Sequence, residues 1–143
     1  PNIQEDAFLA GMLHDVGKLL LLDHPRYYKK LLQTISDESE QTFTAAEYKL
    51  FNTSHAEIGA YLLGLWGLPD PVVEAVACHH RPSLLQFECS PVLMGTCIAN
   101  ALLTSIVEEK SHIDPDILKN EAIGKLLPQW RQRAETLHKE SVK

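Results

Sequence analysis

Residues 54–80 read SHAEIGAYLLGLWGLPDPVVEAVACHH and carry the plainest secondary-structure pattern in the chain. Ser54 and Glu57 have the spacing of a capping box, in which the hydroxyl satisfies a free backbone N–H and the carboxylate reaches back. Apolar residues then recur at helical spacing up to Gly67-Leu68-Pro69, which predicts the end of the helix. Asp70-Pro71 supplies a cap and a preset first turn for a second helix that extends to His80. Four apolar residues of the first helix are expected in the core: Leu62, Leu63, Leu65 and Trp66.

The segments on either side of this stretch are also helical in pattern. Residues 5–15 predict an earlier helix that Gly17 is suited to end. Pro25 fits the first turn of a helix that ends near Ser36, and a polar loop over residues 36–41 follows. The expected apolar face of the earliest helix consists of Leu9, Met12, Leu13 and Val16.

Further helix starts occur before and after the central stretch. Thr44 and Glu47 repeat the capping-box spacing, and a long helix is predicted over residues 91–109. Asp114-Pro115 opens a small helix, and a basic, amphipathic tail closes the chain. Alternating β-type patterns are almost absent, so the sequence predicts an all-α, compact helical bundle. A length of 143 residues suits one domain spanning residues 1–143.

Composition and charge exclude several classes of protein. Hydrophobic residues make up 45% and charged residues 22%, which is typical of a globular domain. The longest apolar run, residues 19–22, is far shorter than the roughly 20 residues of a membrane-spanning helix. A formal charge of −6 argues against a nucleic-acid partner, because binding to phosphates depends on Lys and Arg. The basic stretch from Trp130 to Arg133 is expected to be a solvated terminal helix.

The cysteines and the N-terminus predict a cytoplasmic protein. Three cysteines, Cys78, Cys89 and Cys97, form no CxxC pair and cannot complete a disulfide framework, so reduced thiols are expected. Cys78 is expected to be a buried structural residue, since nothing in the sequence positions a base beside it. The first residues lack a secretory signal and look like a cut inside a longer protein.

Five residues of metal-binding type are candidates for one site. Imidazole and carboxylate groups are ligands of divalent zinc, iron and manganese, and separate helices of a bundle can supply them. His79 lies three residues after Val76 and shares its inward helix face, whereas His24 is an outlying candidate. Each histidine taken alone can equally be structural or exposed, but several together favour a site. The candidate ligands are His14, Asp15, His55, His79 and His80.

Two motifs resemble those of a known family. Residues 8–19, FLAGMLHDVGKL, closely resemble the helix with the His-Asp doublet that names the HD superfamily of metal-dependent phosphohydrolases. Residues 54–60, then Trp66-Gly67-Leu68-Pro69, then His79-His80, resemble the continuation in its HDOD branch. The resemblance covers roughly residues 7–103, and the combination is much more specific than a His-Asp pair alone.

The resemblance implies a ligand set and a chemistry. In active relatives the doublet and further histidines hold one or two metals that activate water for attack on a phosphate ester. By resemblance, His14 and Asp15 are ligands, and His55, His79 and His80 complete or add a site. Lys18 would either contact a phosphoryl oxygen or be a solvated lysine at a helix C-terminus.

Three departures from the active pattern argue against catalysis. Residues 97–102, CIANAL, place Asn100 where active members carry an aspartate, and an amide supplies no anionic ligand. The histidine that precedes the doublet by a few tens of residues in many members has no counterpart here, because the sequence begins only thirteen residues before His14, and an upstream segment is the alternative place for it. Residues 81–85, RPSLL, replace the Gly-Tyr-Pro element of the branch that cleaves cyclic di-GMP, which disfavours that activity.

Two functions therefore stay open. The first is a regulatory signal-transduction module with a partial His/Asp site that binds one divalent ion, Fe, Mn or Zn, and no other cofactor. By resemblance its partners are receiver, GGDEF or EAL domains or proteins, with a homodimer also left open. The alternative is a metal-dependent phosphohydrolase acting on a nucleotide or another phosphate ester. The residues alone assign no catalytic group.

Overall fold

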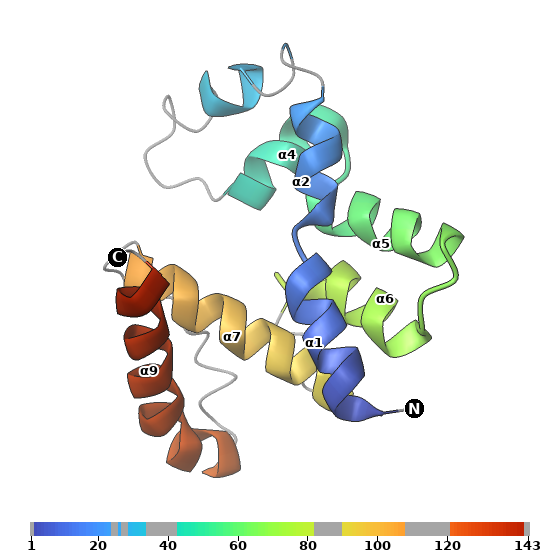
Figure 1. Cartoon of the computed structure of the whole chain (residues 1–143). Coiled ribbons are helices and arrows are strands. Elements are labelled where there is room, and N and C mark those ends of the chain that lie inside the picture. Colours follow the sequence, from blue (N-terminus) through green and yellow to red (C-terminus); the bar gives the residue numbers. More distant parts are fainter. Residues whose placement is uncertain are drawn as a thin grey trace.

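The computed structural model describes residues 2–23, 26, 29–33, 43–81, 90–107 and 121–141. All regular structure in these ranges is helical, with seven labelled helices and no strand, which confirms the all-α prediction (Figure 1). Among these residues no helix is both long and apolar enough to span a membrane. The helices are α1 (Ile3–Leu13), α2 (Val16–Leu22), α4 (Phe43–Phe51), α5 (His55–Leu65), α6 (Asp70–Cys78), α7 (Pro91–Val107) and α9 (Glu121–Ser141).

The bundle is built around α6. This helix packs against α5, α7 and α1, while α2 packs against α5 and α9 packs against α7. Small and branched side chains fill the contact of α1, α6 and α7, with Ala10, Val72 and Ala75 fully buried. Leu63 of α5 is also fully buried beside Val76 of α6, and burying such a leucine contributes about 2 kcal/mol. The arrangement brings the turn after α1, the start of α5 and the end of α6 together.

The contact between α2 and α5 requires glycine. A side-chain carbon on Gly17 would overlap the backbone carbonyl of His55 and lie 2.8 Å from the amide nitrogen of Gly59. The backbones of the two helices therefore touch. This corrects the prediction that Gly17 ends the first helix, because α1 already ends at Leu13 and Gly17 lies in the first turn of α2. Helix packing, and not helix termination, accounts for this glycine.

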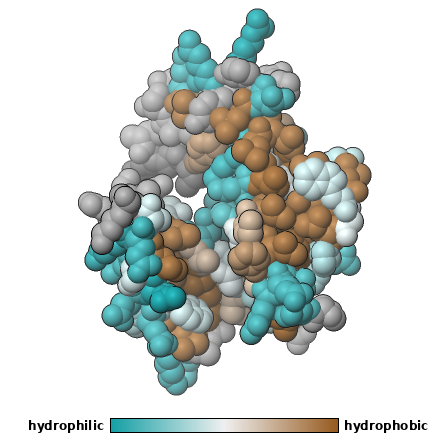
Figure 2. All heavy atoms as spheres, in the orientation of Figure 1, coloured by the Kyte–Doolittle hydropathy of each residue, from teal (hydrophilic) through white to brown (hydrophobic). Residues whose placement is uncertain are grey.

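Several predicted core residues are exposed. On α1 the buried positions are Asp6 and Ala10, whereas Met12 is 66% exposed and Leu9 is 36% exposed. Trp66 is 64% exposed, which overturns its prediction as a core residue. Periodicity fails here because α1 and α5 are apolar around much of their circumference and show no single apolar face. Figure 2 shows apolar side chains gathered over α1 and α2.

The predicted helix ends are partly correct. Ser54 Oγ accepts a hydrogen bond from the Glu57 amide at 3.3 Å, as the capping box predicts, and Gly67 adopts a φ of 76° after α5. Pro69, and not Asp70, is the cap of α6. That helix ends at Cys78, so the two following histidines lie in a turn. Thr44 lies inside α4 and does not cap it.

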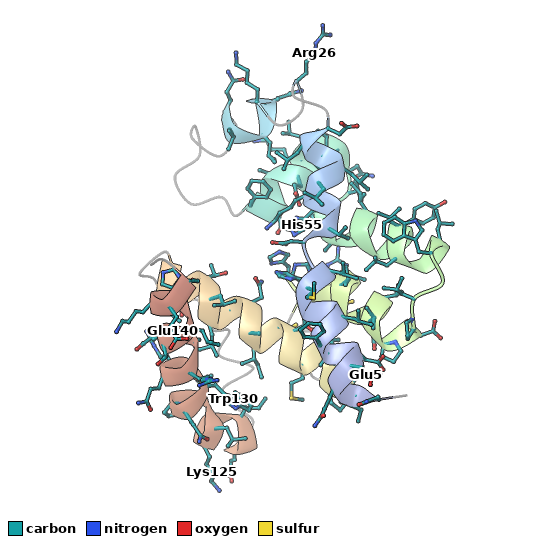
Figure 3. All side chains as sticks on the ribbon, in the orientation of Figure 1. Glu5, Arg26, His55, Lys125, Trp130 and Glu140 are labelled. Atoms are coloured by element: carbon teal, nitrogen blue, oxygen red, sulfur yellow. The ribbon has the colours of Figure 1, made fainter. Side chains whose placement is uncertain are left out.

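The C-terminal helix forms an apolar pocket with α7. Its volume is about 330 Å³, and Trp130 projects from α9 to line it together with Leu102 of α7 (Figure 3). Trp130 therefore belongs to a helix contact, while Arg131 and Arg133 are exposed as expected for a terminal helix. Some predictions lie outside the described residues. These are His24, Pro25, the loop over residues 36–41, residues 82–85 of the RPSLL stretch, Cys89, and the small helix that begins at Asp114-Pro115.

Candidate metal centre

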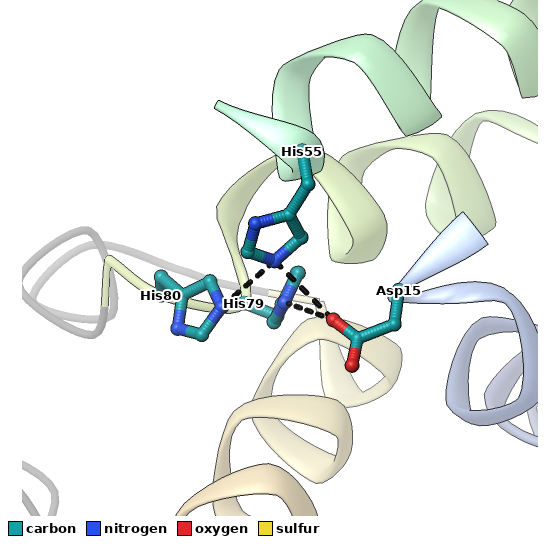
Figure 4. Close-up of side chains that lie close together, drawn as sticks. All are labelled: Asp15, His55, His79 and His80. Carbon is teal, nitrogen blue, oxygen red and sulfur yellow. Dashed lines mark hydrogen bonds and ion pairs between the residues drawn. The ribbon is translucent and has the colours of Figure 1, made fainter. Parts of the chain in front are cut away.

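Four of the five candidate ligands meet at one place. Each offers one nitrogen or oxygen atom, and these atoms lie within 4.8 Å of one another (Figure 4). The side chains come from three parts of the chain, the α1–α2 turn, the first residue of α5 and the turn after α6. Figure 3 places His55 where these segments meet. The group consists of Asp15, His55, His79 and His80.

The buried carboxylate of Glu47 binds His55 on the side of the ring that faces away from the cluster. Its Nδ1 lies 2.7 Å from Oε2 of Glu47, and its backbone N–H donates to the same oxygen at 3.0 Å. Both side chains are 0% exposed. Because a carboxylate accepts hydrogen bonds, Nδ1 must carry the proton, and neutral His55 presents the lone pair of Nε2. That nitrogen lies 3.2 Å from Oδ1 of Asp15.

Backbone carbonyls orient His79 and His14 in the same way. His79 Nδ1 donates to the Val76 carbonyl at 2.8 Å, and His14 Nδ1 donates to the Gly11 carbonyl at 2.8 Å. Both rings therefore present an Nε2 lone pair when neutral. His79 Nε2 is buried without a hydrogen-bond partner and lies 3.7 Å from Oδ1 of Asp15. His14 Nε2 lies 3.6 Å from the other carboxylate oxygen, at the margin of the cluster.

His80 completes the cluster from its open side. Its Nε2 lies 3.0 Å from Nε2 of His55, and its ring centroid is 4.1 Å from that of His79. Although His80 is exposed as a residue, desolvation of its ring by the surrounding protein, reinforced by the neighbouring His79 and His55, lowers its pKa to about 3. His80 is therefore neutral at physiological pH and available as a ligand.

The cluster concentrates negative charge and lone pairs. Burial by itself raises the pKa of Asp15, but the nearby ring nitrogens of His55 and His79 and the hydrogen-bonded ammonium of Lys18 together hold it well below its usual range. Burial also opposes protonation of His55, yet hydrogen bonds to Asp15 and Glu47 raise its pKa overall. The Nε2 atom of His55 thus attracts a cation, which a proton or a metal can supply. The unpartnered, buried Nε2 of His79 makes the donor set fit a divalent metal.

The other charged residues near the cluster have clear partners. Lys18 donates to Oδ2 of Asp15 at 2.7 Å from the first turn of α2, so it is not a solvated lysine at a helix C-terminus. Glu57 accepts hydrogen bonds from Tyr48 at 2.6 Å and from Arg81 at 3.0 Å. Arg81 also donates to the hydroxyl of Tyr48. These contacts join α4, α5 and the turn after α6 beside the ligands.

Sequence reasoning misses one important residue. The spacing of Glu47 from Thr44 indicates a capping box, but the Glu47 carboxylate binds the side chain and backbone of His55. The sign that could have revealed it is a glutamate between Ala46 and Tyr48 in a mainly apolar helix, eight residues before a candidate ligand.

The two described cysteines are unreactive by position. Cys97 is buried, while Cys78 is half-buried with a pKa that burial raises. A raised pKa keeps a thiol protonated and therefore weakly nucleophilic. Cys78 is predicted to be buried, whereas the structure leaves it half-buried.

Comparisons with known proteins agree with this geometry. The family model of the HDOD domain matches residues 1–82, which contain every residue of the cluster. An uncharacterized protein of Treponema pallidum (strain Nichols) is 27% identical over 97 residues. That alignment covers 66% of this chain but only 18% of the Treponema protein, so the chain spans a small part of its relative. No solved structure matches the chain significantly.

Proposed function

The chain belongs to the HDOD family, and we propose that it is a regulatory signal-transduction module that holds one divalent metal ion and hydrolyses no phosphate ester. The observation that carries this proposal is the convergence of three imidazole nitrogens and one carboxylate oxygen. Such a donor set suits zinc, iron or manganese. It contains a single carboxylate, from Asp15.

The composition of the site favours binding over hydrolysis. Two-metal phosphoryl chemistry needs anionic groups that hold both ions and neutralise the reacting phosphate. In the cluster Asp15 is the one carboxylate, and the neighbouring buried carboxylate of Glu47 is hydrogen-bonded to His55. Asn100, which replaces the aspartate of active relatives, lies on α7 and supplies no charge. One metal therefore suits these donors better than two.

A metal at this position would act on the relative placement of distant segments. Its ligands lie on the α1–α2 turn, on α5 and after α6, which are separate in the sequence. Binding that occurs only when these segments are together stabilises that arrangement. This coupling is what a signalling module needs in order to pass an input to another domain. Cytoplasmic receiver, GGDEF or EAL partners, or a second copy, are part of the proposal.

A phosphohydrolase is the second candidate, because two cations flank the cluster. Lys18 contacts Asp15, and Arg81 follows His80 with its side chain 49% exposed. A metal in the cluster would provide Lewis-acid chemistry, and the two cations would hold phosphate oxygens. Both cations already have carboxylate partners, from Asp15 and Glu57, which reduces their availability.

Measuring phosphate-ester hydrolysis by the metal-loaded protein distinguishes the regulatory module from the phosphohydrolase. Protein supplied with Zn²⁺, Mn²⁺ or Fe²⁺ is assayed against nucleotides and simple phosphate mono- and diesters. We expect no turnover from the wild type, and Asn100→Asp tests whether the missing anion alone prevents it. Wild-type turnover that disappears in His55→Ala would establish the enzyme and refute the regulatory proposal.

A further inference from the structure

We infer that Glu47 is a positioning residue of the metal centre, which fixes His55 as a ligand and supplies the second negative charge that a buried divalent ion needs. This inference rests on the proposed metal site. It concerns α4, a helix that carries none of the candidate ligands. Glu47 itself touches no other member of the cluster in the contacts of the described residues.

The geometry leaves His55 one orientation for binding. Both carboxylate oxygens of Glu47 lie close to His55 Nδ1, at 2.7 and 2.9 Å, and one of them also accepts the His55 backbone N–H. Nδ1 therefore carries a proton, and Nε2 is left to face Asp15 and His80. A carboxylate behind a ligating histidine also raises the basicity of the ring. Glu47 thus determines both the direction and the donor strength of His55.

The charge balance gives Glu47 a second role. His55 and His79 have fully buried side chains, so a divalent ion bound to them is removed from water on that side, although the Asp15 side chain is 39% exposed. An uncompensated buried charge is costly, and neutral imidazoles supply no charge. Asp15 provides one negative charge, part of which Lys18 offsets at 2.7 Å. Glu47 is a fully buried carboxylate beside a candidate ligand, and it provides the remaining compensation through His55.

A purely structural role is the competing explanation. The bond from the His55 amide to Glu47 ties α4 to the first turn of α5, and an anion there interacts favourably with the helix dipole. Glu47→Gln distinguishes the structural role from the positioning role. The amide oxygen of glutamine can still accept the hydrogen bond from the His55 backbone, but the substitution removes the negative charge. The matched control is Glu57→Gln, the same change at a partly exposed carboxylate bonded to Tyr48, Thr53 and Arg81.

The test is a competition titration of Zn²⁺ with a chromophoric chelator for the wild type and both variants. We expect Glu47→Gln to weaken Zn²⁺ binding by about 10–100-fold, the usual effect of removing such an outer partner, and Glu57→Gln to change it less than threefold. Equal affinity of Glu47→Gln and wild type, or equal losses in both variants, would overturn the inference. Absence of Zn²⁺ binding by the wild type would instead refute the metal centre itself.

A measurement on the wild type covers the case in which Glu47→Gln does not fold. In the Zn²⁺-loaded protein, nitrogen-proton NMR of the imidazoles reports which ring nitrogen carries the proton. We expect a strongly hydrogen-bonded, downfield Nδ1–H at His55 with Nε2 bound to the metal. A proton on Nε2 of His55, or a metal on Nδ1, would contradict the assigned role of Glu47.

Discussion

Two regions of the molecule bury polar groups in different ways. Around the metal cluster, buried Glu47 and His55 bond to each other across two helices. In α7, buried Thr96 and Ser105 donate to carbonyls of their own helix, at 2.9 and 2.8 Å. The first kind of bond depends on the tertiary fold and positions a site, whereas the second satisfies a hydroxyl locally. Buried polar side chains that bond to a different helix, more than buried polar side chains in general, therefore distinguish the region of the cluster.

The contact between α7 and α9 is correspondingly apolar. Ile98 and Leu102 of α7 pack against Ile123 of α9, and the adjoining pocket is lined mainly by apolar side chains. The region lies after residue 82, beyond the HDOD match. In the described structure α9 packs against α7, and α7 in turn packs against α1 and α6. Stability and metal binding should therefore respond separately to changes in the two regions.

Gly17→Ala should have the largest effect. The added carbon would overlap the His55 carbonyl, and the backbones of α2 and α5 leave little room to move, so we expect a loss of more than about 3 kcal/mol in unfolding free energy. Zn²⁺ binding should fail as well, since α5 carries His55. Chemical denaturation and a Zn²⁺ titration measure the two effects.

The control is Gly95→Ala in α7, where a side-chain carbon meets nothing within 4 Å. Replacing glycine at this exposed position inside a helix should stabilise the protein by about 0.5–1 kcal/mol. Similar effects of the two alanines on stability would contradict the close contact of α2 with α5.

Leu102→Ala should destabilise the fold without weakening the site. Leu102 is 3% exposed and packs between α7 and α9, so its truncation should cost about 2–3 kcal/mol. The metal ligands lie elsewhere, and Zn²⁺ affinity of the folded protein should stay within about threefold of wild type. A parallel loss of affinity would show that the two regions are coupled.

Metal affinity should fall as the pH falls. The pKa of His55 is raised, since Asp15 and Glu47 outweigh the effect of burial, and a proton on Nε2 competes directly with the metal. Below that pKa, each unit of pH should weaken Zn²⁺ binding by about tenfold, or about 1.4 kcal/mol. Above it, binding should become independent of this proton. Titrations between about pH 5.5 and 8.5 that show no slope would contradict His55 as a ligand.

The fold class and the cluster are predictable from the sequence for different reasons. Capping residues and apolar spacing are local signals, so Ser54 and Gly67 by themselves indicate the limits of α5. The candidate ligands follow from residue chemistry and from resemblance to a family, and the structure brings together all of them except His14, which lies at the margin.

The missed features depend on contacts between segments. Glu47 joins His55 only because α4 packs beside α5, and Gly17 is explained only by the close approach of α2. The exposure of Trp66 likewise depends on which side of α5 meets other helices. Spacing along one helix contains none of this information, which is why candidate ligands are easier to predict than the contacts between segments.

The most direct test is elemental analysis of the protein purified without chelator or added metal, repeated on the His14→Ala/Asp15→Ala double mutant. We predict close to one equivalent of zinc, iron or manganese in the wild type and almost none in the mutant, because Asp15 supplies the anionic ligand of the cluster. Absence of metal from both proteins, even after incubation with each ion, would contradict a metal centre at these residues.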